Sequence, residues 1–199
     1  MIPEILEKFI EVFAKLPSIG PRQAMRLAFH FAAFDQNELN KIEKAVAGFK
    51  FLDRCPQCFF FKEKNQKLCR LCRQPNRDPL TIAIIEKETD LLTLEKTGRF
   101  KGRYLVLGDL AEKGSLEPIQ KLRLQSLKNR IKKDFSGQIE EIVIALNPTT
   151  FADFTAELIK EEFKTLAKKI SRLGRGIPTG GEIEFADEET IRHSLERRS

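Results

Sequence analysis

Apolar residues recur at helical spacing through residues 1–52 and predict three short helices. The first apolar series ends at Pro17, and the second helix should open at Pro21, because proline is favoured in the first turn of a helix. The third should begin near Asp35, where Glu38 three residues later resembles a capping box. The apolar faces consist of Ile2, Ile5, Leu6, Phe9, Ile10 and Phe13, then Ala24, Leu27, Ala28 and Phe31, then Leu39, Ile42, Val46 and Phe49. We therefore expect residues 1–52 to form a small helical module.

Beyond Pro79, short aliphatic runs alternate with longer helical patterns. Strands are predicted at residues 80–85, 103–107, 141–146 and 169–173, helices at 117–133 and 153–167, and a last short helix from Asp187. Alternating strands and helices predict a mostly parallel sheet covered by helices on both faces. We expect this α/β domain to occupy residues 79–168 and a Gly-rich segment with a final helix to occupy residues 169–199.

Composition narrows the class of protein. Hydrophobic residues make up 41% of the 199 residues, which is enough for a substantial core. The formal net charge of +6 permits a polyanionic partner without identifying one. No apolar run approaches the roughly 18 residues of a membrane span, and the start of the chain lacks the pattern of a signal peptide. We expect a cytoplasmic protein with no membrane partner.

All four cysteines of the chain occur in two pairs of equal internal spacing. Cys55 and Cys58 form the first C-x2-C pair, and Cys69 and Cys72 form the second after a ten-residue spacer. Two such pairs can supply four thiolates to one tetrahedral Zn²⁺. Since four protein ligands leave no open position for water, we expect one structural zinc ion per chain.

Other roles for the cysteines are two disulfides, four unrelated thiols or a redox C-x-x-C motif. The cytoplasm disfavours disulfides, and a redox motif normally opens a helix in a βαβ unit. Residues 53–78 are instead rich in basic residues and have no long periodic pattern. We predict a loop-rich four-cysteine zinc finger over this range. His30 and His193 do not have ligand-like spacing and are interpreted as packed or helix-surface residues.

A glycine-containing turn separates the first two predicted helices. Free backbone N–H groups at such a turn, and the positive end of the following helix, can meet a phosphate. The candidate DNA contacts are Ser18, Gly20, Arg22 and Arg26, the two arginines lying four residues apart on one helix face. The segment resembles the helix-hairpin-helix of DNA-repair proteins, which holds DNA by its backbone. Those hairpins usually carry Gly-x-Gly, where this chain has Ser18 first. The alternative is a plain turn.

Taken in chain order, several features resemble the RecR family of bacterial recombination mediators. They are the hairpin, the four cysteines, the strand ending in Ile84, Ile85 and Glu86, and the tail from Arg172 to Glu188. The segment 96–108 is also similar to a strand-to-loop segment of that family, so the resemblance runs nearly end to end. It implies a Toprim-type α/β domain and a ring-like homo-oligomer able to encircle DNA. It also implies partnership with RecO and RecF in loading recombinase onto gapped DNA.

The resemblance bears on the acidic residues of the α/β domain. Enzymatic Toprim domains hold Mg²⁺ with a Glu after the first strand and an Asp-x-Asp after a later strand. Glu86 fits the first position, and Asp90 matches an acidic residue that the RecR family also has. The later strand leads instead to Phe151, Ala152 and Asp153, where RecR proteins commonly have Glu-Gly-Glu. We expect Glu86 and Asp90 to serve a partner or DNA at the carboxyl edge of the sheet, not a Mg²⁺ clamp.

Two further segments have candidate roles. The predicted helix 117–133 could present a basic stripe to backbone phosphates, although most such runs are solvated faces. Its basic residues are Lys121, Arg123, Lys128, Arg130, Lys132 and Lys133. Residues 175–181 lack the Gly-Lys-Ser/Thr of a Walker loop, and we expect a shaped loop at a subunit contact.

Three function classes remain open from the sequence. The favoured class is a non-enzymatic DNA clamp and recombination mediator in recombinational DNA repair. The alternative is a metal-dependent Toprim nuclease or primase-like enzyme. A zinc-stabilised scaffold that contacts only proteins is the third.

Overall fold

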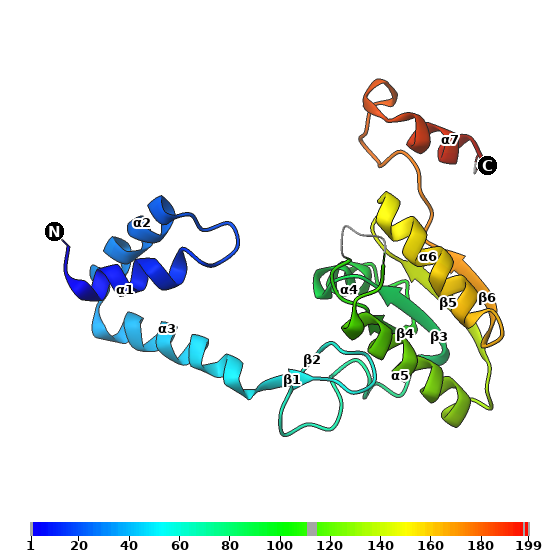
Figure 1. The fold of residues 1–199 in the computed structure, drawn as a ribbon, viewed down its shortest axis with the longest axis horizontal. Coiled ribbons are helices and arrows are strands. Elements are labelled where there is room, and N and C mark those ends of the chain that lie inside the picture. Colours follow the sequence, from blue (N-terminus) through cyan, green and yellow to red (C-terminus); the bar gives the residue numbers. More distant parts are fainter. Residues whose placement is uncertain (1, 111–114, 197, 199) are drawn as a thin grey trace. The chain divides into compact units, whose positions relative to one another are not determined.

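The computed structural model describes residues 2–110, 115–196 and 198 (Figure 1). The chain divides into two compact units, Met1–Leu52 and Asp53–Ser199. Within the described residues, no helix combines the length and the apolar character that crossing a membrane requires.

The first unit contains the three predicted helices, α1 (Glu4–Phe13), α2 (Pro21–Ala32) and α3 (Gln36–Gly48), followed by the short helix η1 (Phe49–Phe51). Asp35 caps α3 as predicted, because its carboxylate accepts from the backbone N–H of Glu38 at 2.8 Å and the Glu38 carboxylate accepts from the backbone of Asp35 at 3.1 Å. Rings of α1 and α2 pack together, with the Phe9 and Phe31 centroids 5.0 Å apart.

This first unit buries few of its apolar residues. Among its described residues only Ala24 and Ala28 are buried, because the helices are short and form a single thin layer of contact. Eight large apolar side chains stay exposed, namely Ile5, Val12, Leu16, Met25, Phe29, Val46, Phe49 and Phe51. The unit therefore leaves a broad apolar surface uncovered.

The second unit opens with the cysteine segment and continues into an α/β domain. Two three-residue strands, β1 (Leu52–Arg54) and β2 (Phe61–Glu63), pair around the first cysteines. The sequence pattern did not predict these strands, since three residues are too few to show a period. The main sheet has the order β4-β3-β5-β6, with β3 (Asp78–Ile85) and β5 (Ile139–Ala145) at its centre.

All neighbouring strands of the main sheet run parallel, as the alternating pattern predicted. The edge strands are β4 (Gly102–Val106) and β6 (Ala167–Arg172). The register sets Ile82 opposite Ile142 and Ile84 opposite Ile144. Those four side chains share one face, and because alternate residues of a strand face opposite sides, Ala83, Ile85 and Ala145 form an apolar cluster on the other.

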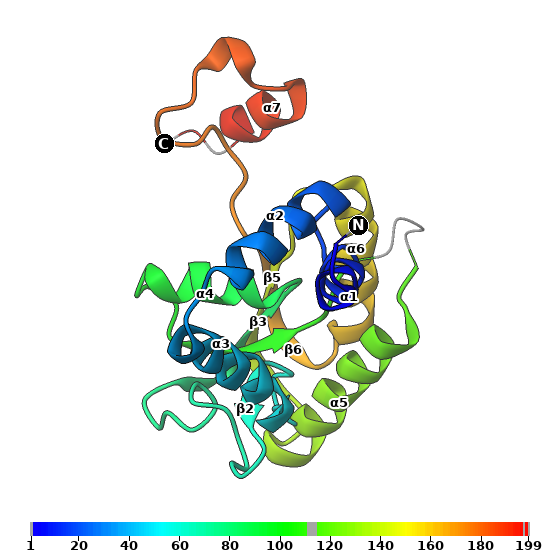
Figure 2. The ribbon, with the colours of Figure 1, turned by 90° about the vertical axis from the view of Figure 1, so that its left-hand side faces the viewer.

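Helices cover both faces of the sheet (Figure 2). The helices α5 (Pro118–Asp134) and α6 (Thr150–Phe163) lie on one face, over a core that includes Leu124, Leu127 and Phe163. The helix α4 (Glu88–Lys96) covers the other face through the buried Leu91. Phe60 and Leu71 from the cysteine segment pack against the same cluster as Leu91, and Phe59 packs against the clusters on both faces, so the segment contacts both sides of the sheet.

Some predicted boundaries were wrong. The helix expected at residues 153–167 is α6, which begins three residues earlier because the Thr149 side chain caps it by accepting from Ala152 N–H at 3.2 Å. It ends at Phe163 because the chain must turn before β6 begins at Ala167. The final helix, α7 (Glu188–Glu196), follows the short helix η2 (Ile183–Phe185), and it starts one residue after the position predicted for it.

Candidate functional site

The four cysteines converge on one point although they come from two separate turns. Their sulfur atoms all lie within 4.8 Å of one another, and all four side chains are buried. The backbone N–H of Cys69 points at the sulfur of Cys55 at 3.4 Å, and that of Cys72 points at the sulfur of Cys69 at 3.4 Å. Backbone N–H groups directed at sulfur favour thiolates, which are the metal-binding form of cysteine.

The chemistry of this donor set fits a tetrahedral metal ion. Among the described residues it is the only group of three or more metal-binding side chains that converges in this way. Four thiolates this close would repel one another unless a cation lies between them. The cluster can therefore hold a metal ion.

The cysteine segment is fixed to the α/β domain by backbone and side-chain hydrogen bonds. The backbone N–H of Val106, at the end of β4, donates to the carbonyl of Cys58 at 2.8 Å. Arg130 of α5 donates to the carbonyl of Gln57 at 2.7 Å, and Arg103 of β4 donates to the Gln57 side chain at 3.3 Å. A metal bound here would thus be coupled to the main sheet.

The hairpin of the first unit carries the four residues that the sequence suggested as DNA contacts. Ser18 has a φ of +62°, the left-handed conformation that glycine adopts most easily, at the position where related hairpins have glycine. Gly20 precedes α2 and provides no side-chain cap, so no capping side chain occupies the positive end of α2. Arg22 and Arg26 are both exposed on α2.

The basic stripe suggested for α5 is not a continuous surface. Arg123 is buried, donates to the carbonyl of Val106 at 3.1 Å and lies over the ring of Phe59. Lys128 forms an ion pair with Glu162 of α6 at 2.6 Å, and Arg130 is committed to Gln57. The pattern misled because charged residues at helical spacing can satisfy carbonyl groups as well as face solvent. The remaining basic residues of the set, Lys121, Lys132 and Lys133, are exposed.

Glu86 and Asp90 lie where the sequence placed them, just beyond the carboxyl end of β3. Glu86 is only 8% exposed, and its carboxylate accepts a 2.8 Å hydrogen bond from the side-chain amide of Asn147, which follows β5. The Asp90 carboxylate accepts from the backbone N–H of Lys87 at 2.8 Å and so caps the start of α4. Each carboxylate is therefore engaged in local structure.

Asp153 is directed toward two arginines. Its carboxylate forms ion pairs with Arg172, at the end of β6, and with Arg175 in the following loop. Arg175 also donates to Glu189 of α7 at 2.9 Å. Burial opposes the ionisation of Asp153, but the two arginines outweigh it and hold the pKa of this carboxyl below its usual value. Asp153 thus anchors the C-terminal segment.

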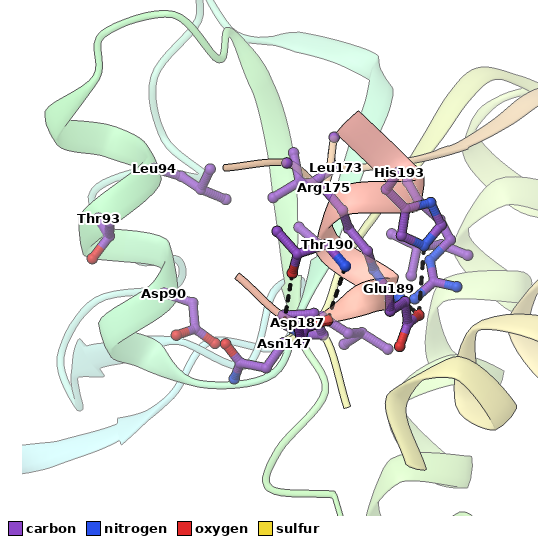
Figure 3. Close-up of a pocket in the computed structure, with 17 residues that line it drawn as sticks. Asp90, Thr93, Leu94, Asn147, Leu173, Arg175, Asp187, Glu189, Thr190 and His193 are labelled. Carbon is purple, nitrogen blue, oxygen red and sulfur yellow. Dashed lines mark hydrogen bonds and ion pairs between the residues drawn. The ribbon is translucent and has the colours of Figure 1, made fainter. Parts of the chain in front are cut away.

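A cavity of about 470 Å³ lies at this carboxyl edge of the sheet (Figure 3). Asp90 and Asn147 lie on one side of it, and Glu189, Thr190 and His193 of α7 lie across from them. Of the acidic pair expected here, Asp90 lines the cavity, whereas Glu86 is held beneath the surface. The sequence analysis missed Asn147 and His193 as site residues, because neither belongs to a motif with a recognisable spacing.

Comparisons with known proteins cover the whole chain. The Toprim domain model matches residues 81–174, and the model described as RecR, C-terminal matches residues 176–199. Recombination protein RecR of Paenarthrobacter aurescens (strain TC1) is 34% identical, with 97% of this chain and 95% of the relative covered. Recombination protein RecR of Clostridium perfringens (strain 13 / Type A) is 36% identical, with 99% of this chain and 97% of the relative covered. Recombination protein RecR of Chlorobaculum tepidum is 36% identical, with 98% of this chain and 96% of the relative covered.

Proposed function

This chain belongs to the RecR family of recombination proteins, and from that premise we propose that it is a DNA-binding recombination mediator in DNA repair. The observation that carries the proposal is relationship to recombination proteins over nearly the full length of both chains. In this proposal the protein works in the cytoplasm with RecO and RecF to load recombinase onto gapped DNA.

DNA contact is assigned in this proposal to the hairpin before α2. The uncapped helix end can meet one phosphate, and the exposed Arg22 and Arg26 can meet others. Ser18 and Gly20 shape the turn, so that the backbone can approach the DNA closely. Contacts of this kind carry no sequence information, which suits a protein that must act at gaps anywhere in a chromosome.

The metal is zinc in this proposal, bound by Cys55, Cys58, Cys69 and Cys72 as a closed structural site. Tetrahedral Zn²⁺ with Zn–S bonds of about 2.3 Å requires sulfur atoms that nearly touch, as these do. Zinc bound by four thiolates joins the two cysteine turns to each other and has no open position for a substrate.

We include in the proposal a homo-oligomer that is ring-like, as in the family expectation, and exposed apolar side chains in both units support it. Phe49 of the first unit is 70% exposed, and Ile183 and Phe185 in the C-terminal segment are 71% and 79% exposed. Burial of these side chains against another copy of the chain would remove them from water.

The proposed mediator has no catalytic activity. Glu86 is buried and bonded to Asn147, and Asp153 is neutralised by Arg172 and Arg175. A Mg²⁺ clamp needs carboxylates with free oxygens that point to one place, and these carboxylates are directed elsewhere.

Salt-dependent DNA binding and size together test the proposal. Purified protein should bind gapped DNA at low salt and lose affinity steeply as salt rises, and light scattering should give a mass of several chains with and without DNA. A strictly monomeric protein that DNA does not retain would contradict it.

The enzyme alternative is tested with labelled gapped and single-stranded DNA in Mg²⁺ or Mn²⁺, and cleavage or synthesis that disappears in Glu86→Ala would replace the mediator with an enzyme.

A further inference from the structure

Two arginines beside the cysteine cluster have buried N–H groups without hydrogen-bond partners. These groups are the Nε of Arg103 and the Nε and Nη2 of Arg130, and no acceptor among the described residues reaches them. Each arginine uses one other nitrogen to bind Gln57, between the first two cysteines. A buried guanidinium with unused donors is costly unless a negative charge lies close by.

The cysteine cluster lies beside both arginines, because Gln57, which both of them bind, is the neighbour of Cys58 in the chain. Arg103 lines the same small hollow as Cys58 and Cys72. Arg130 reaches the same segment through its 2.7 Å hydrogen bond to the carbonyl of Gln57. Arg77 also lines the hollow but is differently engaged, since it forms an ion pair with Glu95.

The net charge of a four-thiolate zinc site matches the charge of the two arginines. Four thiolates around one Zn²⁺ leave two net negative charges in a buried site. Backbone N–H groups directed at the sulfurs disperse part of that charge but cancel none of it. Two guanidinium groups supply two positive charges, so the metal centre and both arginines together are neutral.

We propose that Arg103 and Arg130 are the counter-charges of the metal centre and lock the bound ion to the α/β domain. The inference rests on the proposed zinc site and deepens it. Arg103 comes from β4 and Arg130 from α5. The cysteine segment thus provides the metal ligands, and the α/β domain provides the two positive charges that balance the site. Both arginines act through the thiolates and are positioning residues. They retain the metal, and the metal in turn keeps the cysteine segment docked.

The test measures the rate at which zinc passes from the folded protein to a coloured chelator. Arg130→Met keeps an unbranched apolar stem but removes the guanidinium with its charge and donors, and it should release zinc about 10- to 100-fold faster than the wild type, as expected for loss of an outer-shell partner. Arg103→Met should act in the same direction. Arg130→Lys restores the charge and should recover much of the slow release.

Arg123→Met is the matched control. Arg123 lies on the same helix as Arg130, is buried and also has an unpartnered Nε, but the charges nearest to it are Arg54 and Glu88. Its replacement should lower thermal stability while zinc release stays at the wild-type rate. Wild-type release rates in both Arg130→Met and Arg103→Met would overturn the inference, as would equal acceleration in Arg123→Met. A finding that the purified wild-type protein contains no zinc would instead overturn the zinc proposal, on which this inference rests.

Discussion

The side-chain amide of Asn147 donates a 2.8 Å hydrogen bond to the buried carboxylate of Glu86, and this bond joins the ends of β5 and β3. The two central strands of the sheet are therefore tied together at the edge where α/β folds usually place their sites. The carboxylate of Glu86 lies at such an edge, but it accepts a hydrogen bond from a neighbouring loop of the same domain.

Removing the donor should leave that carboxylate unsatisfied. We expect Asn147→Ala to lower the free energy of unfolding by about 1–3 kcal/mol, the usual cost of a buried group without a partner. Urea unfolding followed by circular dichroism measures it. Asn129→Ala is the control, because Asn129 bonds only to Gln125 on an exposed face of α5, and a change of about 0.5 kcal/mol or less is expected there. Equal effects of the two substitutions would show that the bond to Glu86 adds nothing.

The hairpin arginines should act through phosphates. Replacement of both Arg22 and Arg26 by Ala should weaken DNA binding to a similar degree for all sequences and reduce the slope of log affinity against log salt by about two. Fluorescence anisotropy over a series of salt concentrations measures both effects. The double variant Lys41→Ala and Lys44→Ala, which loses the same charge from exposed positions on α3, should change the slope less. An unchanged slope in the arginine variant would make the hairpin a plain turn.

Metal removal should loosen the segment between β1 and β3. A chelator under reducing conditions should make residues 53–78 sensitive to protease, because structural zinc contributes much of the folding free energy of such short modules. Replacing Cys55 and Cys69 by Ser should give the same cleavage without chelator. Metal analysis of the untreated protein should find one zinc ion per chain. A segment that stays resistant after complete removal of zinc would argue against a structural metal.

The ion pairs of Asp153 should make the stability of the second unit depend on pH in acid. Arg172 and Arg175 hold the pKa of Asp153 below its ordinary value of 3.8, so their stabilisation is complete above that pH and is lost as the pH falls through the lower value of the folded state. We expect Asp153→Asn to lower stability by roughly 1 kcal/mol or less near neutral pH. The difference from the wild type should shrink below pH 3.8, as followed by thermal unfolding.

Asp134→Asn provides the control for this pH effect, because Asp134 is exposed at the end of α5. Its unfolding curves should follow those of the wild type throughout the acid range. A constant difference between Asp153→Asn and the wild type at every pH would exclude the ion pairs as its cause.

Most of the fold could be predicted from the sequence because its elements are amphipathic or continuously apolar. The buried run from Ile82 to Ile85 indicates a central parallel strand, and the capping box of Asp35 and Glu38 indicates a helix start. The helix α4 was missed because it is short: only Leu91 and Leu94 pack against the core, and two apolar residues are too few to establish a helical period.

The sites were harder to predict, because sequence spacing shows which residues can be ligands but does not show what surrounds them. Paired cysteines indicated a metal site, and the structure brings all four together. The engagement of Glu86 with Asn147 and of Asp153 with Arg172 depends on how distant strands end beside each other. No local pattern encodes such pairs. For the same reason, Arg123 and Arg130 looked like surface charges until their carbonyl partners were located.

The four cysteines leave the ribosome well before Arg103 and Arg130, since chains are made from the N-terminus. A nascent chain can thus close its metal loop before the strand and the helix that carry the two arginines have been made. Zinc captured at that stage should exchange freely with the cell's metal pool, and it should become trapped only when β4 and α5 have been synthesised and folded. The interval between these two events is when a wrong metal could still be rejected.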